Sequence, residues 1–173
     1  MHSINGRFYW IIVSIISVLV SACSNITDEK ISPEANSSLR ELVSLNVYKS
    51  PTCGCCGQWV EYMERNGFAA HTHDSMDLAA IKTEHGINPQ YRSCHTAVST
   101  DGFVFEGHIP AKYVHQFLSD TPEGAIGLAV PAMPVGSPGM EVDDKFMPYQ
   151  VLLIKKDGGS EVYADISTRE EQL

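Results

Sequence analysis

The chain has 173 residues, 12 Lys and Arg against 21 Asp and Glu, and a formal net charge of −9. This length suits one domain with enough chain to bury a core. Hydrophobic residues make up 43% and charged residues 19%, which excludes a disordered chain and a coiled coil. An acidic chain without a basic cluster is not expected to bind nucleic acid, which needs concentrated Lys and Arg. The outstanding feature is five cysteines, three of them within four positions.

Residues 1–22 predict a signal peptide of the lipoprotein type. Arg7 precedes an apolar run, residues 8–20, which is shorter than the roughly twenty residues of a spanning helix. A positive charge, a short apolar core and small residues before a cleavage point are typical of signal peptides. The sequence Val20-Ser21-Ala22-Cys23 resembles a bacterial lipobox, with Cys23 as the residue that is lipidated. An ordinary signal peptide with an incidental cysteine and an uncleaved anchor stay open as alternatives.

The lipobox predicts a periplasmic protein that is anchored by its lipid to the outer membrane. The prediction of the outer membrane rests on Ser24, because lipoproteins with a serine after the lipidated cysteine are usually sorted to the outer membrane. In this compartment thiols oxidise unless a metal or a reductant holds them. Residues 23–40 are polar and contain Pro33, which predicts a tether. Residues 41–173 are the expected folded domain.

Hydrophobic periodicity, turn residues and helix caps predict the elements of this domain. In chain order they are a strand at 42–48, a helix at 58–66 ended by Gly67, a strand at 68–73, a helix at 78–85 capped by Asp77, a hairpin of 96–99 and 103–107, a helix from Pro110 to Leu118, an ordered loop at 125–141 rich in Gly, Pro and Met, and a terminal hairpin of 151–154 and 161–164.

The order β-α-β-α-β-β-α, with first connections long enough for crossovers, predicts a mixed sheet covered by helices. It is also the order of the thioredoxin core, with cysteines placed after the first strand. We therefore predict an α/β fold, a thioredoxin-like mixed sheet with flanking helices, followed by the C-terminal Gly/Pro/Met loop and a β-hairpin.

The cysteine motif is Cys53-Gly54-Cys55-Cys56, at the junction of a strand and a helix. Free backbone N–H groups and the helix dipole stabilise a thiolate there. Cys53 and Cys56 are three positions apart and share one face of the first turn. Cys94 precedes the third predicted strand, and in a thioredoxin-type fold this position faces the motif. Together with Cys55, it would complete a four-sulfur pocket.

Three interpretations of these cysteines are open. In the first they bind a soft metal, because thiolates select Cu(I), zinc or iron–sulfur clusters. Three crowded sulfurs suit the bridging thiolates of a polynuclear Cu(I) cluster better than zinc, whose ligands usually form two separated pairs. In the second, Cys53 and Cys56 exchange disulfides, with Cys55 or Cys94 resolving. In the third, the four cysteines form two structural disulfides, which would brace little of a chain this long.

Four blocks of the sequence carry a resemblance to a known family. They are YKSPTCGCCGQWV (48–60), RSCHTAV (92–98), EGHIP (106–110) and GLAVPAMPVGSPGME (127–141). They resemble the CopG-like proteins of bacterial copper resistance, which are extracytoplasmic, thioredoxin-like metal-binding proteins. The blocks occur in the order of that family, and the resemblance covers about residues 42–163.

The resemblance implies copper binding by the CxCC motif and the later cysteine, here Cys53, Cys55, Cys56 and Cys94. It also implies redox work in which thiols help to interconvert copper states. We therefore expect an extracytoplasmic Cu(I)-binding protein whose partners are copper ions, the membrane and other envelope proteins that handle copper. A thiol–disulfide oxidoreductase acting on envelope proteins is the alternative, and a zinc module without redox function is the third candidate. Ala132 stands where the family suggests glycine.

Three further side chains are candidates for auxiliary metal ligands. His95 adjoins Cys94, and Met133 and Met140 flank the Pro/Gly loop. Thioether sulfur is a soft ligand, although methionine is more often a filler of cores. A hydrogen bond to the backbone explains His95 equally well. For the loop, the alternative to metal binding is that it forms a lid over the cysteines. His108 is expected only to cap the last core helix or to pack against it.

Overall fold

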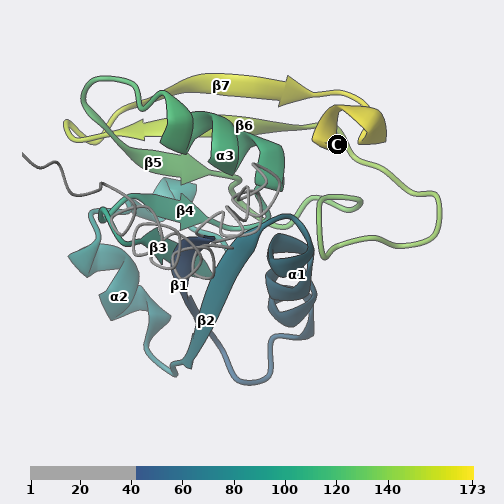
Figure 1. Ribbon diagram of the computed structural model, residues 1–173, viewed down its shortest axis with the longest axis horizontal. Coiled ribbons are helices and arrows are strands. Elements are labelled where there is room, and N and C mark those ends of the chain that lie inside the picture. Colours follow the sequence, from purple (N-terminus) through teal and green to yellow (C-terminus); the bar gives the residue numbers. More distant parts are fainter. Residues whose placement is uncertain (1–41) are drawn as a thin grey trace, which may run out of the picture. The chain divides into compact units, whose positions relative to one another are not determined.

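The computed structural model describes residues 42–173, so the predicted signal peptide, Cys23 and the whole predicted tether lie outside the described residues (Figure 1). The elements in chain order are β1 (Val43–Lys49), α1 (Gly54–Arg65), β2 (Phe68–Asp74), α2 (Leu78–Glu84), η2 (Pro89–Tyr91), β3 (Thr96–Ser99), β4 (Val104–Glu106), α3 (Ala111–Ser119), β5 (Ala125–Ala129), β6 (Tyr149–Lys155), β7 (Ser160–Ile166) and η3 (Arg169–Gln172).

The strands form one seven-stranded sheet in the order β2-β1-β3-β4-β5-β6-β7. β1 is parallel to β2 and β4 to β5, whereas the other neighbouring pairs are antiparallel. The predicted mixed α/β sheet with flanking helices is therefore confirmed. The finer assignment to a thioredoxin-like fold stays a prediction. Among the described residues, no helix is long and apolar enough to cross a membrane.

Alternation along the strands separates two apolar clusters, one on each face of the sheet. Ala97, Phe105 and Leu128 belong to the larger cluster, which also contains the buried residues of α1 and α3. The smaller cluster contains their neighbours along the strands, Val98, Val104 and Ala129. These side chains pack with Ile87 and Tyr91, which come from the connection between α2 and β3. The segment that carries Cys94 thus follows a connection that is packed against the sheet by Ile87 and Tyr91.

Helix α1 begins at Gly54, four residues before the predicted start at Gln58. Cys55 and Cys56 are therefore part of its first turn, and Cys53 is its N-cap residue. Trp59 and Met63 are fully buried, as expected from their shared helical face, and hold α1 against the sheet. The helix ends before Gly67, whose φ of +87° is the left-handed conformation typical of a helix end.

The prediction of a loop over residues 125–141 was wrong for its first five residues, which form β5. The strand lies between β4 and β6 and is buried on both faces, so it lacks the polar alternation that marks a half-buried strand. Gly127 permits close approach of β4, because a Cβ there would lie 1.8 Å from the carbonyl oxygen of Val104. The Gly/Pro/Met loop proper runs from 130 to 148, and the predicted terminal hairpin is confirmed as β6 and β7.

Ala132, in this loop, has a φ of +60°, a left-handed conformation that side chains with a Cβ disfavour. This backbone geometry explains why the family suggests glycine at the position. The side chain is exposed, so its removal leaves no cavity.

We expect Ala132→Gly to raise the free energy of unfolding by about 1 kcal/mol, because glycine removes the Cβ strain. Ala80→Gly is the matched control, since Ala80 is also exposed but lies within α2. It should lower the free energy of unfolding by about 1 kcal/mol. Urea unfolding of both variants measures the difference, and a destabilised Ala132→Gly protein would contradict the strain argument.

Candidate metal centre

Four cysteine sulfurs converge at the N-terminus of α1. Cys53 is the N-cap residue of the helix, and Cys55 and Cys56 lie in its first turn. Cys94 comes from the segment between η2 and β3. The four sulfur atoms all lie within 4.8 Å of one another. The fold therefore brings together the four residues that the sequence analysis singled out as metal ligands.

The cluster contains one disulfide, between Cys53 and Cys56. Cys55 and Cys94 are free thiols, and the Cys55 sulfur lies 3.6 Å from that of Cys53. Among residues 42–173 no second disulfide is present, so the interpretation as two structural disulfides does not describe this state. The arrangement combines an oxidised pair with two sulfurs that can still bind a metal or attack a disulfide.

The backbone around the motif favours negative charge. The Cys53 side chain makes no capping hydrogen bond to the helix, and the first turn of α1 contains no acidic residue. The first N–H groups of a helix have no partner within it, and with the helix dipole they stabilise an anion. A Cβ added at Gly54 or Gly57 would meet nothing within 4 Å, so the motif is open on these sides.

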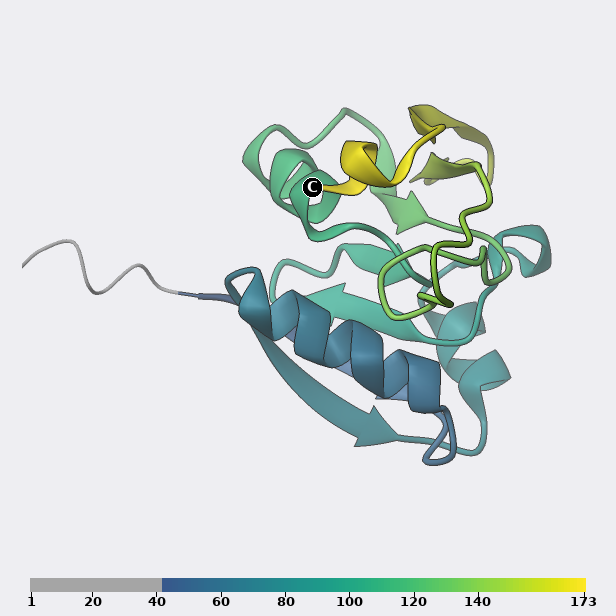
Figure 2. The same ribbon diagram turned by 90° about the vertical axis from the view of Figure 1, so that its right-hand side faces the viewer.

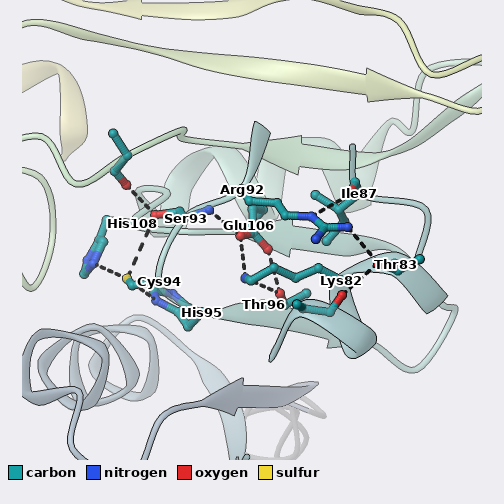
Figure 3. A network of polar contacts seen from close by, with 12 residues as sticks. Lys82, Thr83, Ile87, Arg92, Ser93, Cys94, His95, Thr96, Glu106 and His108 are labelled. Atoms are coloured by element: carbon teal, nitrogen blue, oxygen red, sulfur yellow. Dashed lines mark hydrogen bonds and ion pairs between the residues drawn. The ribbon is translucent and has the colours of Figure 1, made fainter. Parts of the chain in front are cut away.

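Two histidines contact the fourth cysteine (Figure 3). The Cys94 sulfur lies 3.3 Å from Nδ1 of His95 and 3.0 Å from Nε2 of His108. The three residues form a second group whose ligand atoms lie within 4.8 Å of one another. Cys94 belongs to both groups, so it links the cysteine cluster to a pair of imidazoles.

The expectation that His108 only caps or packs was incomplete, because this fully buried side chain is part of the site. Its Nδ1 lies 2.8 Å from the carbonyl oxygen of Pro138 and must donate the hydrogen bond there. Its Nε2 is then unprotonated and accepts from the Cys94 thiol. The available signal in the sequence was its place in the EGHIP block, because a histidine that is buried needs polar partners.

His95 adjoins Cys94 as the sequence indicated, and its ring is also fully buried. The ring packs against Trp59, with centroids 4.4 Å apart, and Nε2 has no hydrogen-bond partner. Burial lowers the pKa of His95 well below its usual range, helped by His108 and Lys82, and burial also lowers the pKa of His108. Both imidazoles are therefore neutral near pH 7 and retain a lone pair.

Burial, followed by the charge of Cys55, raises the pKa of the Cys94 thiol to about 11. Cys94 lies outside α1, so it lacks the helix-terminal N–H groups that stabilise a thiolate. In the metal-free protein it is a protonated thiol at neutral pH. Any metal that it binds must displace this proton.

The Gly/Pro/Met loop lies against the first turn of α1, as the view of Figure 2 shows. Gly139 packs so closely that a Cβ there would lie 2.8 Å from the carbonyl oxygen of Cys55. Met140 follows directly and is half-buried, whereas Met133 is 49% exposed. Of the two candidate methionines, Met140 is thus adjacent to a residue in contact with the motif.

Comparison with known proteins places the chain among copper-resistance proteins. A family model described as "Protein of unknown function, DUF411" matches residues 91–140. Two solved structures titled "Copper resistance protein copG", Form 2 and Form 1, are each 38% identical, with TM-scores of 0.69. The alignments cover 73% and 74% of this chain and 99% and 100% of the solved chains. No curated protein gives a significant match.

The raised pKa of Cys94 predicts the pH dependence of its alkylation in the metal-free protein. The thiolate is the reactive form, so the rate should rise about tenfold per pH unit between about pH 8 and pH 10, without a plateau. Iodoacetamide labelling followed by mass spectrometry of the Cys94 peptide measures this rate. The same peptide in urea-unfolded protein is the control and should level off near its ordinary pKa; a plateau below about pH 10 in the folded protein would contradict the burial argument.

Proposed function

The chain belongs to the CopG-like family of copper-resistance proteins, and we propose that it binds Cu(I) through Cys53, Cys55, Cys56 and Cys94. The observation that carries this proposal is the convergence of four sulfurs within 4.8 Å at a helix N-terminus. Thiolates are soft ligands that select Cu(I) over hard cations. In the cell this protein would withdraw copper from the envelope and so support copper resistance.

The spacing of the sulfurs supports a shared or bridged metal site. A metal–thiolate bond is about 2.3 Å long, taking zinc as the reference, so two sulfurs on one ion lie at most about 4.6 Å apart. The four sulfurs of this protein already lie close to that limit. Reduction of the Cys53–Cys56 disulfide is required before all four can act as thiolates.

The neutral imidazoles extend the donor set that we propose. His108 directs Nε2 at the Cys94 sulfur, and His95 directs Nδ1 at it, so both are auxiliary ligand candidates. Met140 is a third, because Gly139 before it packs on the first turn of α1. Met133 is the weakest of the proposed ligands, since half of its side chain is exposed.

The disulfide supports a redox function linked to copper. Oxidation of the Cys53 and Cys56 thiols releases two electrons and two protons, which reduces two Cu(II) ions to two Cu(I) ions. The reverse reaction would oxidise Cu(I) and restore the two thiols. Cys55 and Cys94 would hold copper during either step, because they are free when the disulfide is closed.

The cellular setting is also a proposal. We infer a periplasmic protein attached to the outer membrane through a lipid on Cys23, because residues 20–23 resemble a lipobox and Ser24 follows the cysteine. This location places the thiols where copper and oxidants meet them. Its partners would then be copper ions and other envelope proteins that exchange copper.

A thiol–disulfide oxidoreductase acting on envelope proteins is the second candidate. The Cys53–Cys56 disulfide beside the free thiol of Cys55 favours it. Such an enzyme passes through a mixed disulfide with its substrate. A Cys56→Ala variant that captures a defined envelope protein would favour this candidate over copper binding.

Anaerobic Cu(I) titration of the reduced protein against a coloured Cu(I) chelator tests the copper site. We expect more than one tightly bound copper per chain, and loss of this stoichiometry in Cys94→Ala. His108→Ala should weaken binding by about tenfold if its imidazole ligates. His85→Ala is the control, because His85 lies on the C-cap of α2 and in neither ligand group. A protein that cannot compete for any copper would refute the proposal.

Anaerobic addition of Cu(II) to the reduced, metal-free protein tests the redox function. Two equivalents of Cu(II) should consume two thiols per chain and yield two Cu(I), because the Cys53–Cys56 pair supplies two electrons. Thiol counting measures the thiols consumed, a Cu(I) chelator measures the Cu(I) formed, and mass spectrometry of the linked peptide detects the disulfide. Cys56→Ser should lose the linked peptide, and Cys23→Ser should retain it. Equal Cu(I) yields from wild type and Cys56→Ser would contradict this assignment of the reductant.

A further inference from the structure

A buried ion pair lies beside the candidate metal centre without belonging to either ligand group. Nζ of Lys82, on α2, lies 2.6 Å from Oε1 of Glu106, at the end of β4. Their side chains are 6% and 0% exposed. Burying two charges costs desolvation energy that their attraction often fails to recover, so such a pair is weak evidence of a role in stability alone.

The Glu106 carboxylate is fully engaged by donors from three segments (Figure 3). Besides Lys82, its Oε1 accepts the backbone N–H of Ser93 at 2.5 Å. Its Oε2 accepts the hydroxyl of Thr96 at 2.6 Å, and Lys82 also donates to that hydroxyl at 2.9 Å. The carboxylate therefore joins α2, β3, β4 and the residue immediately before Cys94.

The segment around Cys94 depends on such side-chain contacts, because residues 92–95 belong to no helix or strand. The hydroxyl of Ser93 donates to the carbonyl oxygen of Ala132. One residue beyond Cys94, the carbonyl of His95 accepts the N–H of Gly107 at 3.0 Å. Glu106 thus fixes the N-terminal side of Cys94, while the residue after Glu106 fixes the other side.

We propose that Glu106 is a positioning residue for Cys94, with Lys82 balancing its charge: the Ser93–Glu106 hydrogen bond holds the Cys94 sulfur opposite the CxCC motif. The consequence for copper rests on the function proposed above, but the position of the sulfur does not. A displacement of about 1 Å in a reacting or ligating group is enough to cost orders of magnitude in effective concentration. Loss of this bond should therefore be visible in the chemistry of Cys94.

Two double variants separate positioning from the ion pair. Lys82→Met/Glu106→Gln removes both charges, but the glutamine oxygen still accepts from Ser93 and its amide donates to Thr96. Lys82→Met/Glu106→Leu removes both charges and also leaves the Ser93 N–H without this acceptor. Replacing a buried pair by neutral groups of similar volume is often tolerated, so both are expected to fold. They differ in the Ser93 contact that the proposal invokes and in the contact with Thr96, which Thr96→Val tests separately.

The first measurement requires no metal. In a Cys23→Ser/Cys53→Ser/Cys56→Ser background, Cys55 and Cys94 are the remaining cysteines. Oxidised glutathione converts their two thiols into one disulfide and yields two reduced glutathione molecules. The equilibrium constant gives the effective concentration of the pair. We expect it to fall by about tenfold in the leucine variant and to be restored in the glutamine variant. Equal values in the two variants would overturn the proposal.

The second measurement is Cu(I) stoichiometry in the chain with all its cysteines. The leucine variant should lose copper to the chelator earlier than the glutamine variant. If the wild type binds no copper, the proposed function fails, while the glutathione equilibrium still decides the role of Glu106. Thr96→Val is the control for general damage, because it removes a hydrogen bond from the same carboxylate and leaves the Ser93 contact intact.

Glu106→Asp keeps the test decisive if the leucine variant does not fold. The shorter carboxylate still pairs with the flexible Lys82 side chain, but its oxygen is withdrawn from the Ser93 N–H. We expect the same roughly tenfold fall in the glutathione equilibrium, with circular dichroism unchanged. An Asp variant with the wild-type equilibrium would count against positioning by Glu106.

Discussion

The structure depends on holding a cysteine from an irregular segment against the first turn of a helix. Three consecutive residues at the end of β4 perform this task. The Glu106 side chain accepts from Ser93, the Gly107 N–H donates to the carbonyl of His95, and the His108 ring accepts from the Cys94 thiol. Only glycine fits the middle position, because φ is +79° and a Cβ would lie 2.5 Å from the Val130 carbonyl oxygen. Residues 106–108 thus hold the segment that carries Cys94 through three different contacts.

The same burial that fixes Cys94 determines its electrostatics. Removal from solvent raises the pKa of the thiol to about 11 and lowers the pKa of both neighbouring histidines. All three groups are therefore neutral in the metal-free state, although the chain carries a net charge of −9. A cation that binds here supplies the positive charge that stabilises the thiolate, and in return the site releases a proton. The affinity of this residue for a metal ion would therefore depend on pH.

The elements and the cysteines were predictable from the sequence because their signals are local. Periodicity and caps located the helices and most strands, and the motif itself identified Cys53, Cys55 and Cys56. Strand β5 was not recognised, because burial on both faces removes the alternation on which the prediction relied. The roles of His108 and of the Lys82–Glu106 pair arise from contacts 14 and 24 residues apart in the sequence. The EGHIP block marks His108 as a histidine that needs polar partners, but no local pattern identifies Cys94 as its partner or pairs Lys82 with Glu106.

The disulfide and the proposed copper cluster compete for the same atoms. A sulfur in the Cys53–Cys56 bond cannot serve as a thiolate, so closing the bond removes two of the four proposed ligands in one step. Cys55, Cys94 and the two histidines would remain, because the disulfide uses none of them. Oxidation would therefore weaken a copper site without dismantling it. In the oxidising compartment proposed above, this arrangement would couple copper release to the redox state of the thiols. The proposed contact between Glu106 and Ser93 would keep Cys94 in place for reduction and for binding of new copper.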